Sequence, residues 1–210
     1  MKAITATSTG GTNYEPVAAG TYVARCYSMV HIGTITENMM GEKKELNKVR
    51  ITWELPTETK VFKEENGEQP HAISKEFTLS MHEKATLRKF LESWRGKGFT
   101  EDEAKSFDIT KLLGVPCMIS IIHKTSKTTG KTYAEIASVS TMPKGMQCPA
   151  QVNKTFVFSH EEFDQESFDA LPDFLKDKVR QSKEYMAKKQ PHVTEAPSSN
   201  IEMSDDDLPF

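Results

Sequence analysis

The feature that most constrains the fold is a strict two-residue alternation in "ELNKVRITWELP", residues 45–56. The apolar positions are Val49, Ile51, Trp53 and Leu55, and the polar positions between them are Lys48, Arg50, Thr52 and Glu54. Because successive strand side chains point to opposite faces, this pattern predicts a strand with one face in a core. Pro56 is expected to end the strand, since proline cannot donate a hydrogen bond to a sheet.

Four other segments also read as strands. They are residues 20–33, 72–81, 115–124 and 131–142. The first of them carries apolar side chains on both faces, which predicts a bend or a bulge partway along it. The turn-rich sequence "TSKTTG" between the last two predicts a hairpin connection.

A helix is predicted between the third and fourth strands. Its apolar stripe consists of Leu87, Phe90, Leu91 and Trp94. Ser80 and Glu83 have the spacing of a capping box at its start, Gly96 stops it, and Thr100 with Glu103 repeats the box for a shorter helix. Three strands, a helix and two strands are the layout of an OB-fold, a five-stranded Greek-key barrel, so the sequence predicts a mainly β fold of this class.

Composition divides the rest of the chain. Residues 1–18 are expected to be flexible, and residues 19–147 to form the barrel. Residues 148–189 predict a helical extension, begun by a capping box at Ser159 and Glu162 and packed on the barrel or on another subunit. The Pro-, Ser- and acid-rich residues 190–210 predict a disordered acidic tail. The sequence leaves open whether the chain is a monomer or a homo-oligomer.

The formal net charge of −3 is unevenly distributed. Residues 195–210 contain five acidic and no basic residues, which leaves residues 1–194 with a charge of +2. A mildly basic body with an acidic tail favours a nucleic-acid partner.

The cysteines and the apolar runs indicate the cellular compartment that we expect. Cys26 and Cys117 lie in strand-like apolar runs, and no CxxC spacing occurs, which indicates free and buried thiols. No signal peptide or membrane span is predicted, so we expect a cytoplasmic protein that does not bind membranes.

Sequence motifs for enzymatic chemistry are missing. "TSKTTGKT" lacks the leading glycine of a phosphate-binding loop, and the six histidines show no zinc-binding spacing. Glu54 and Glu135 lie on different strands without neighbouring acids, so we expect solvated side chains instead of a nuclease metal site. The expectation is a non-catalytic protein without metal or cofactor.

An OB-fold would bind a single strand across its second and third strands, between the loops that join strands 1–2 and strands 4–5. The basic candidates for this groove are Arg25, Lys43, Lys44, Lys48, Arg50, Lys75, Lys124, Lys127 and Lys131. Candidates for stacking on bases are Tyr27, Phe62 and Tyr133. Trp53 and Trp94 are assigned to the core because of their positions in the apolar patterns.

Two resemblances support this interpretation. The terminal "SDDDLPF" resembles the acidic C-terminal tip of bacterial-type single-stranded DNA-binding proteins. "AGTYVARC", "KVRITWELP", "LRKFLESWRGKGF" and "SVSTMPKGM" resemble phage-encoded members of that class. The resemblance implies a protein that coats single-stranded DNA during phage replication or recombination, in the host cytoplasm. Its tip would recruit replication, recombination and repair proteins through Asp205, Asp206, Asp207, Leu208, Pro209 and Phe210.

Two alternatives stay open from the sequence. A recombination mediator on the same fold would promote annealing of complementary strands instead of only protecting them. A small metal-dependent nuclease would draw its carboxylates from distant segments of the chain.

Overall fold

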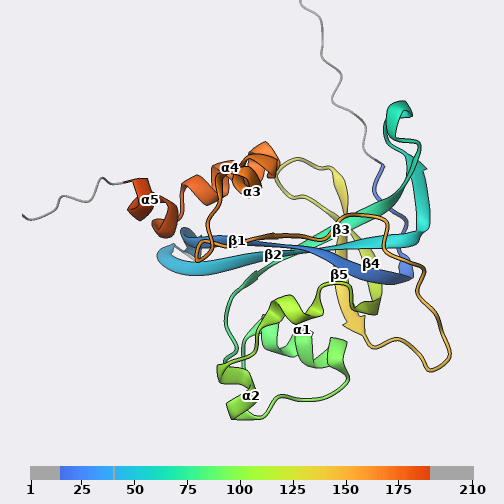
Figure 1. The fold of residues 1–210 in the computed structure, drawn as a ribbon, viewed down its shortest axis with the longest axis horizontal. Helices are drawn as coiled ribbons and strands as arrows, with labels where there is room; N and C mark the ends of the chain where they lie inside the picture. Colours follow the sequence, from blue (N-terminus) through green and yellow to red (C-terminus); the bar gives the residue numbers. More distant parts are fainter. Residues whose placement is uncertain (1–14, 40, 190–210) are drawn as a thin grey trace, which may run out of the picture.

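A computed structural model describes residues 15–39 and 41–189. Six strands form one mainly antiparallel sheet (Figure 1). They are β1 (Gly20–Met39), β2 (Glu42–Val61), β3 (Glu68–Thr78), β4 (Pro116–Thr125), β5 (Thr132–Ser140) and β6 (Phe156–Phe158). The strand order is β3-β2-β1-β4-β5, and β6 pairs in parallel with β1.

The described strands do not close into a hydrogen-bonded barrel. No ladder joins the two ends of the order, β3 and β5. The two strands nevertheless approach each other, and Lys75 Nζ on β3 donates a hydrogen bond of 2.6 Å to the carbonyl oxygen of Ile136 on β5. The closed barrel that the sequence predicts is therefore not completed by backbone hydrogen bonds.

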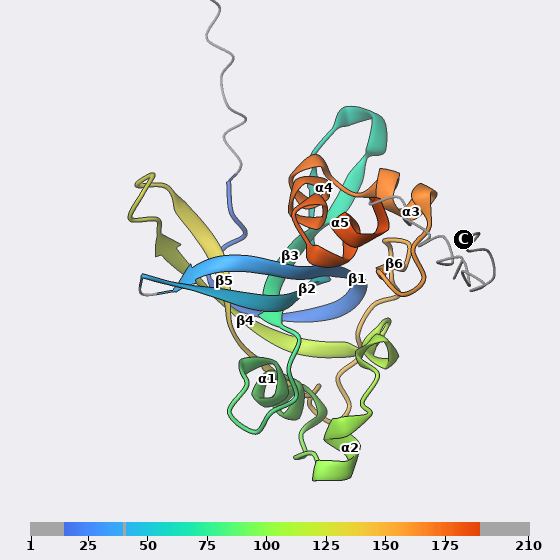
Figure 2. The same ribbon diagram turned by 90° about the vertical axis from the view of Figure 1, so that its left-hand side faces the viewer.

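Helices cover both faces of the sheet. They are α1 (Thr86–Arg95), α2 (Glu101–Lys105), α3 (Gln165–Ala170), α4 (Asp173–Arg180) and α5 (Lys183–Lys189), with 3-10 turns η1 (Glu64–Asn66) and η2 (Ile109–Leu112). Figures 1 and 2 show α1 and α2 on one side of the sheet and α3, α4 and α5 on the other. Within the described residues, no helix is both long and apolar enough to cross a lipid bilayer.

The main core lies between the sheet and α1. Trp53 is fully buried, and its ring centroid lies 5.6 Å from those of both Phe90 and Trp94 on α1. The apolar face of β2 and the apolar stripe of α1 are both buried, as their sequence patterns predict. Cys26 and Cys117 are free and buried, also as predicted, and burial raises the pKa of the Cys26 thiol to about 12.

Strand β1 is irregular because it contributes to two cores. Its register against β2 shifts between Cys26 and Ser28 and again between His31 and Gly33, so the predicted irregularity occurs at two places instead of one. The first bulge moves Met29 to the side of Cys26 in the main core and places Val30 on the opposite face. Without the bulge, the alternation of side chains along β1 would place Val30 on the same face as Cys26, in the main core.

A second core forms on the opposite face of β1. It consists of Val30, Phe158, Phe168, Leu171, Leu175, Val179 and Tyr185, with Phe156 and Phe163 packed against it. Apart from Val30, all these residues come from the segment 156–185, which contains β6 and most of the helical extension. The extension 148–189 thus packs on the sheet of its own chain, which answers the question that the sequence left open.

Two predicted helix starts are wrong. Helix α1 begins at Thr86, six residues after Ser80, and the Ser80 hydroxyl instead accepts a hydrogen bond from the backbone N–H of His82. Helix α3 is capped by Asp164 instead of Ser159. In both places a local turn uses the serine oxygen, because such side chains favour turns as well as caps.

The predicted cap of α2 and the predicted stop of α1 are confirmed. Thr100 and Glu103 form a reciprocal capping box at α2, with hydrogen bonds of 3.2 Å and 3.1 Å. Gly96 ends α1 in the left-handed conformation, where a glycine is favoured.

Strands β1 and β2 are longer than predicted. The segment predicted to be their connecting loop is mostly paired, from Thr34 with Asn47 to Met39 with Glu42. Pro56 does not end β2; it lies where the pairing with β3 breaks between Leu55 and Thr59, and the strand then continues to Val61. Most of segment 1–18 and all of tail 190–210 lie outside the described residues.

Gly33 allows the helical extension to approach β1. Its φ of +93° is in the region that favours glycine, and it lies at the second bulge. A Cβ atom there would lie 2.7 Å from Glu184 Oε2, from His160 Nε2 and from Ser182 Cβ. Any larger residue would therefore push α5 away from the sheet.

We expect Gly33→Ala to lower the free energy of unfolding by about 2 kcal/mol or more, through backbone strain and steric overlap. Gly41→Ala is the matched control, because Gly41 has a φ of +89° and a Cβ atom added to it would meet no other atom within 4 Å. Urea unfolding measures both. Equal losses for the two variants would show that the contact with α5 adds nothing.

Candidate nucleic-acid interface

Two adjoining clefts lie on the outer face of the sheet, the face opposite α1. One has a volume of about 260 Å³ and is bordered by β1, β2, β3 and α4; the other, of about 250 Å³, is bordered by β2, β3 and β5. Both are lined by Arg50, Ala72 and Ser74. Together they form one depression, which we call the trough.

Arg50 lies at the centre of the trough. The alternation of β2 buries Val49 and Ile51 in the main core and so directs Arg50 to the outer face. Its guanidinium donates a hydrogen bond of 3.0 Å to Glu76 Oε1 and lies 5.2 Å from the ring centroid of Phe174. The predicted binding residue thus sits in the trough, but with an acidic neighbour.

Two of the three predicted stacking residues also line the trough. Tyr27 on β1 is half-buried, and Tyr133 on β5 keeps 44% of its surface exposed. Burial, assisted by the negative charge of Glu54, raises the pKa of the Tyr27 hydroxyl, so this group stays neutral. The structure therefore brings Tyr27, Arg50 and Tyr133 together from three different strands.

The hairpin between β4 and β5 carries a net positive charge. Lys124 forms an ion pair of 3.0 Å with Glu135, whereas Lys127 and Lys131 are exposed and have no ion pair within the described residues. In Figures 1 and 2 this hairpin and α4 rise on the same side of the sheet. Exposed lysines beside the trough are suited to phosphate groups.

The β1–β2 hairpin is not basic, although it contributes three of the predicted lysines. Lys44 pairs with Glu42 at 3.5 Å, and Lys48 pairs with Glu37 at 2.9 Å. Glu45 also lies in this hairpin, so its three acids balance Lys43, Lys44 and Lys48. Naming the lysines of this segment without its acids therefore overstates its positive charge.

Two other predicted cations hold the fold together. Arg25 donates hydrogen bonds to the carbonyl oxygens of Gly114, Cys148 and Pro149, at 2.6, 3.3 and 2.9 Å. Lys75 donates to Ile136 across the gap between β3 and β5. Neither side chain lines the trough.

Phe62 and Glu54 do not line the trough. Phe62 directly follows β2, is 42% exposed and makes an edge contact with His71, with ring centroids 5.0 Å apart. The sequence predicts a solvated Glu54, but this residue is fully buried and accepts hydrogen bonds from Val152 N and from Asn153 N and Nδ2. Glu54 is buried because Val152 and Asn153 of the extension cover this part of the sheet.

Helix α4 is clamped to the rim of the trough through Glu76. Lys178 Nζ donates hydrogen bonds of 2.7 Å and 2.8 Å to the two carboxylate oxygens of Glu76, which also accepts from Arg50. Burial opposes ionisation of Glu76, but Lys178 and Arg50 outweigh it and lower the pKa of the carboxyl group. The sequence gives little sign of this clamp, because Glu76 and Lys178 are 102 residues apart.

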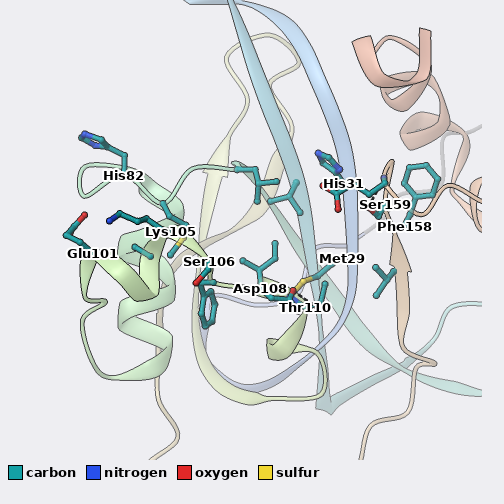
Figure 3. Close-up of a pocket in the computed structure, with 18 residues that line it drawn as sticks. Met29, His31, His82, Glu101, Lys105, Ser106, Asp108, Thr110, Phe158 and Ser159 are labelled. Atoms are coloured by element: carbon teal, nitrogen blue, oxygen red, sulfur yellow. Dashed lines mark hydrogen bonds between the residues drawn. The ribbon is translucent and has the colours of Figure 1, made fainter. Parts of the chain in front are cut away.

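A third cleft, of about 720 Å³, is lined by Met29 and His31 of β1 and by residues of α2 and β6 (Figure 3). Figure 3 shows His82, Glu101 and Lys105 on one side of it and His31 and Ser159 on the other. Its floor is apolar, its polar side chains are of mixed charge, and none of the predicted binding residues lines it.

Searches for other chemistry and for relatives give no identification. Within residues 15–39 and 41–189, no group of three or more His, Cys, Asp or Glu side chains is arranged to hold a metal ion. No family model matches this chain, and comparisons with curated proteins and with solved structures give no match. The partner-binding hypothesis for Asp205–Phe210 concerns residues outside the described part and stays a prediction.

We expect acid to loosen the helical extension. Hydrogen bonds from Thr34 outweigh burial and lower the pKa of Glu184, and the pKa of Glu76 is lowered as well, so both acids bind protons less readily in the folded protein. Burial likewise lowers the pKa of His160. The stability that His160 supplies is lost as the pH falls below about 6.5, whereas the stability that Glu76 and Glu184 supply is lost only as the pH falls below about 4.

Hydrogen-exchange protection factors of α4 and α5, compared at pH 7, pH 5 and pH 3, measure this loss. The reference is the amide of Ile119 in β4, which is buried in the main core. Glu76→Gln should weaken protection at pH 7 and reduce its pH dependence. Protection that is independent of pH in the unmodified protein would contradict the expectation.

Proposed function

We propose that this protein binds single-stranded nucleic acid, in the first place DNA, without strong sequence preference. The observation that carries the proposal is the trough, where Arg50 lines both the cleft of Tyr27 and the cleft of Tyr133, beside the lysine-bearing β4–β5 hairpin. Single-strand binders combine positive charge along the backbone with aromatic rings for the bases. Here the hairpin lysines would contact phosphates, and bases would lie in the trough.

The proposed architecture is an OB-type barrel with an incomplete seam. The element order, with α1 and α2 between β3 and β4, and the approach of β3 to β5 through Lys75 support this assignment. In such a fold the ligand crosses the second and third strands. Arg50 and Ser74, on β2 and β3, occupy that position in the trough.

The proposed biological role follows the resemblance noted in the sequence. The protein would coat exposed strands during replication, recombination or repair, and residues 205–210 would recruit partner proteins. Deleting Asp205–Phe210 should leave strand binding intact or tighter while removing partner capture. Loss of strand binding on this deletion would argue against a separate recruiting role for the tail.

The main test is the salt dependence of binding to a fluorescent oligo(dT), measured by anisotropy. The double variant Lys127→Glu/Lys131→Glu should weaken binding about tenfold or more, and make the log–log salt slope shallower by about 1.4, because two phosphate contacts are lost. Lys43→Glu/Lys44→Glu changes the same charge on the balanced β1–β2 hairpin and should have a smaller effect. If both pairs behave alike, the site is not where we place it.

Labelled strands incubated with the protein and Mg²⁺ and then resolved on a native gel separate the alternative functions. Intact, retarded strands are expected. Cleaved strands would replace the proposal by a nuclease, and faster pairing of complementary strands would favour a recombination mediator. Absence of binding even in dilute buffer would refute the proposal.

A further inference from the structure

We propose that α4 forms one wall of the binding site and that Phe174 stacks on a base of the bound strand. The inference rests on the proposed function and extends it to the helical extension. None of the sequence patterns that indicate the groove point to this region, which lies more than thirty residues beyond the last sheet strand of the predicted barrel.

Phe174 is an exposed apolar residue that lies beside the buried apolar face of α4. Leu175 and Val179 on α4 are 4% and 0% exposed in the second core, whereas Phe174 is 52% exposed. A single exposed ring means little by itself. Its location gives it meaning, because Phe174 lines the trough together with Tyr27 and Arg50.

Arg50 orients the ring of Phe174. The guanidinium lies 5.2 Å from the ring centroid and is itself held by Glu76 at 3.0 Å. A cation in this position is attracted to the face of an aromatic ring. The contact leaves about half of the Phe174 surface open to a base, while Arg50 stays within reach of the same nucleotide.

Lys178 fixes the helix beneath the ring. It lies four residues after Phe174, one turn along the same side of α4, and donates two hydrogen bonds to Glu76 on β3. The wall is thus fixed to the sheet before a ligand arrives. A stacking ring that is already positioned loses less conformational entropy on binding.

The floor between the two exposed rings is open to flat ligands. Ala72 and Ser74 on β3 line both clefts, with Phe174 in one cleft and Tyr133 in the other. Both floor side chains are small, so they leave room for bases above β3. The two rings are therefore suited to neighbouring parts of one strand, with Arg50 between them.

The test compares Phe174→Ala, Phe174→Trp and Met186→Ala in the full chain. Met186 on α5 is the matched control, since it is 50% exposed in the same extension but does not line the trough. With labelled oligo(dT), Phe174→Ala should weaken binding about fivefold to a hundredfold, the range expected for one stacked base. Met186→Ala should bind like the unmodified protein, and Phe174→Trp should bind at least as tightly.

Phe174→Trp gives a second reading that does not depend on affinity. The natural tryptophans, Trp53 and Trp94, are buried in the main core, so a new exposed tryptophan would dominate any change in fluorescence. Stacking on a base should quench it when oligo(dT) is added at saturation. An unquenched complex, or equal affinities for Phe174→Ala and the unmodified protein, would overturn the role of Phe174 while leaving strand binding established. If the unmodified protein does not bind oligo(dT), the proposed function itself is wrong.

Discussion

The burial of β1 on both of its faces is the constraint on which the rest of the structure depends. One face, with Cys26 and Met29, belongs to the core beneath α1, and the other, with Val30, belongs to the core formed by β6 and α3–α5. The bulge after Cys26 makes this division possible, because beyond it the odd-numbered Met29 faces the main core and the even-numbered Val30 faces the second core. Without the second core, α4 would have no support, and the trough would lack its wall.

The sequence predicts the parts of the fold that periodicity controls. The alternation of β2 and the helical stripe of α1 correctly identify Trp53 and Trp94 as core residues. Prediction fails where a tertiary contact decides between equal local choices. The segment 34–44 looks like a loop but is mostly paired in the β1–β2 ladder, and the extension contacts this hairpin through Lys183 and Glu45. At Ser80 the choice is local, because its hydroxyl serves a turn instead of a helix cap.

The candidate site is predictable to the same degree. The alternation of β2 predicts that Arg50 points away from the core, and the position of Tyr133 directly after a basic hairpin predicts that it is exposed. Both trough residues can therefore be identified from local sequence. Phe174 and Glu76 cannot be found in this way, because the docking of α4 on the sheet decides which helix residue stays exposed. Counting lysines alone also misplaces positive charge on the β1–β2 hairpin, where Glu37 lies across the ladder from Lys44 and forms an ion pair with Lys48.

The position of the extension in the chain has a consequence for biosynthesis. All strands of the main core are translated before residue 141, whereas β6 and α3–α5 follow between residues 156 and 189. Since chains emerge from the ribosome in order, the main core can assemble while the outer side of β1 is still uncovered. Until residues 156–189 have been translated, Val30 is exposed to solvent and the trough lacks the wall formed by α4. Docking of this segment buries Val30 and completes the trough.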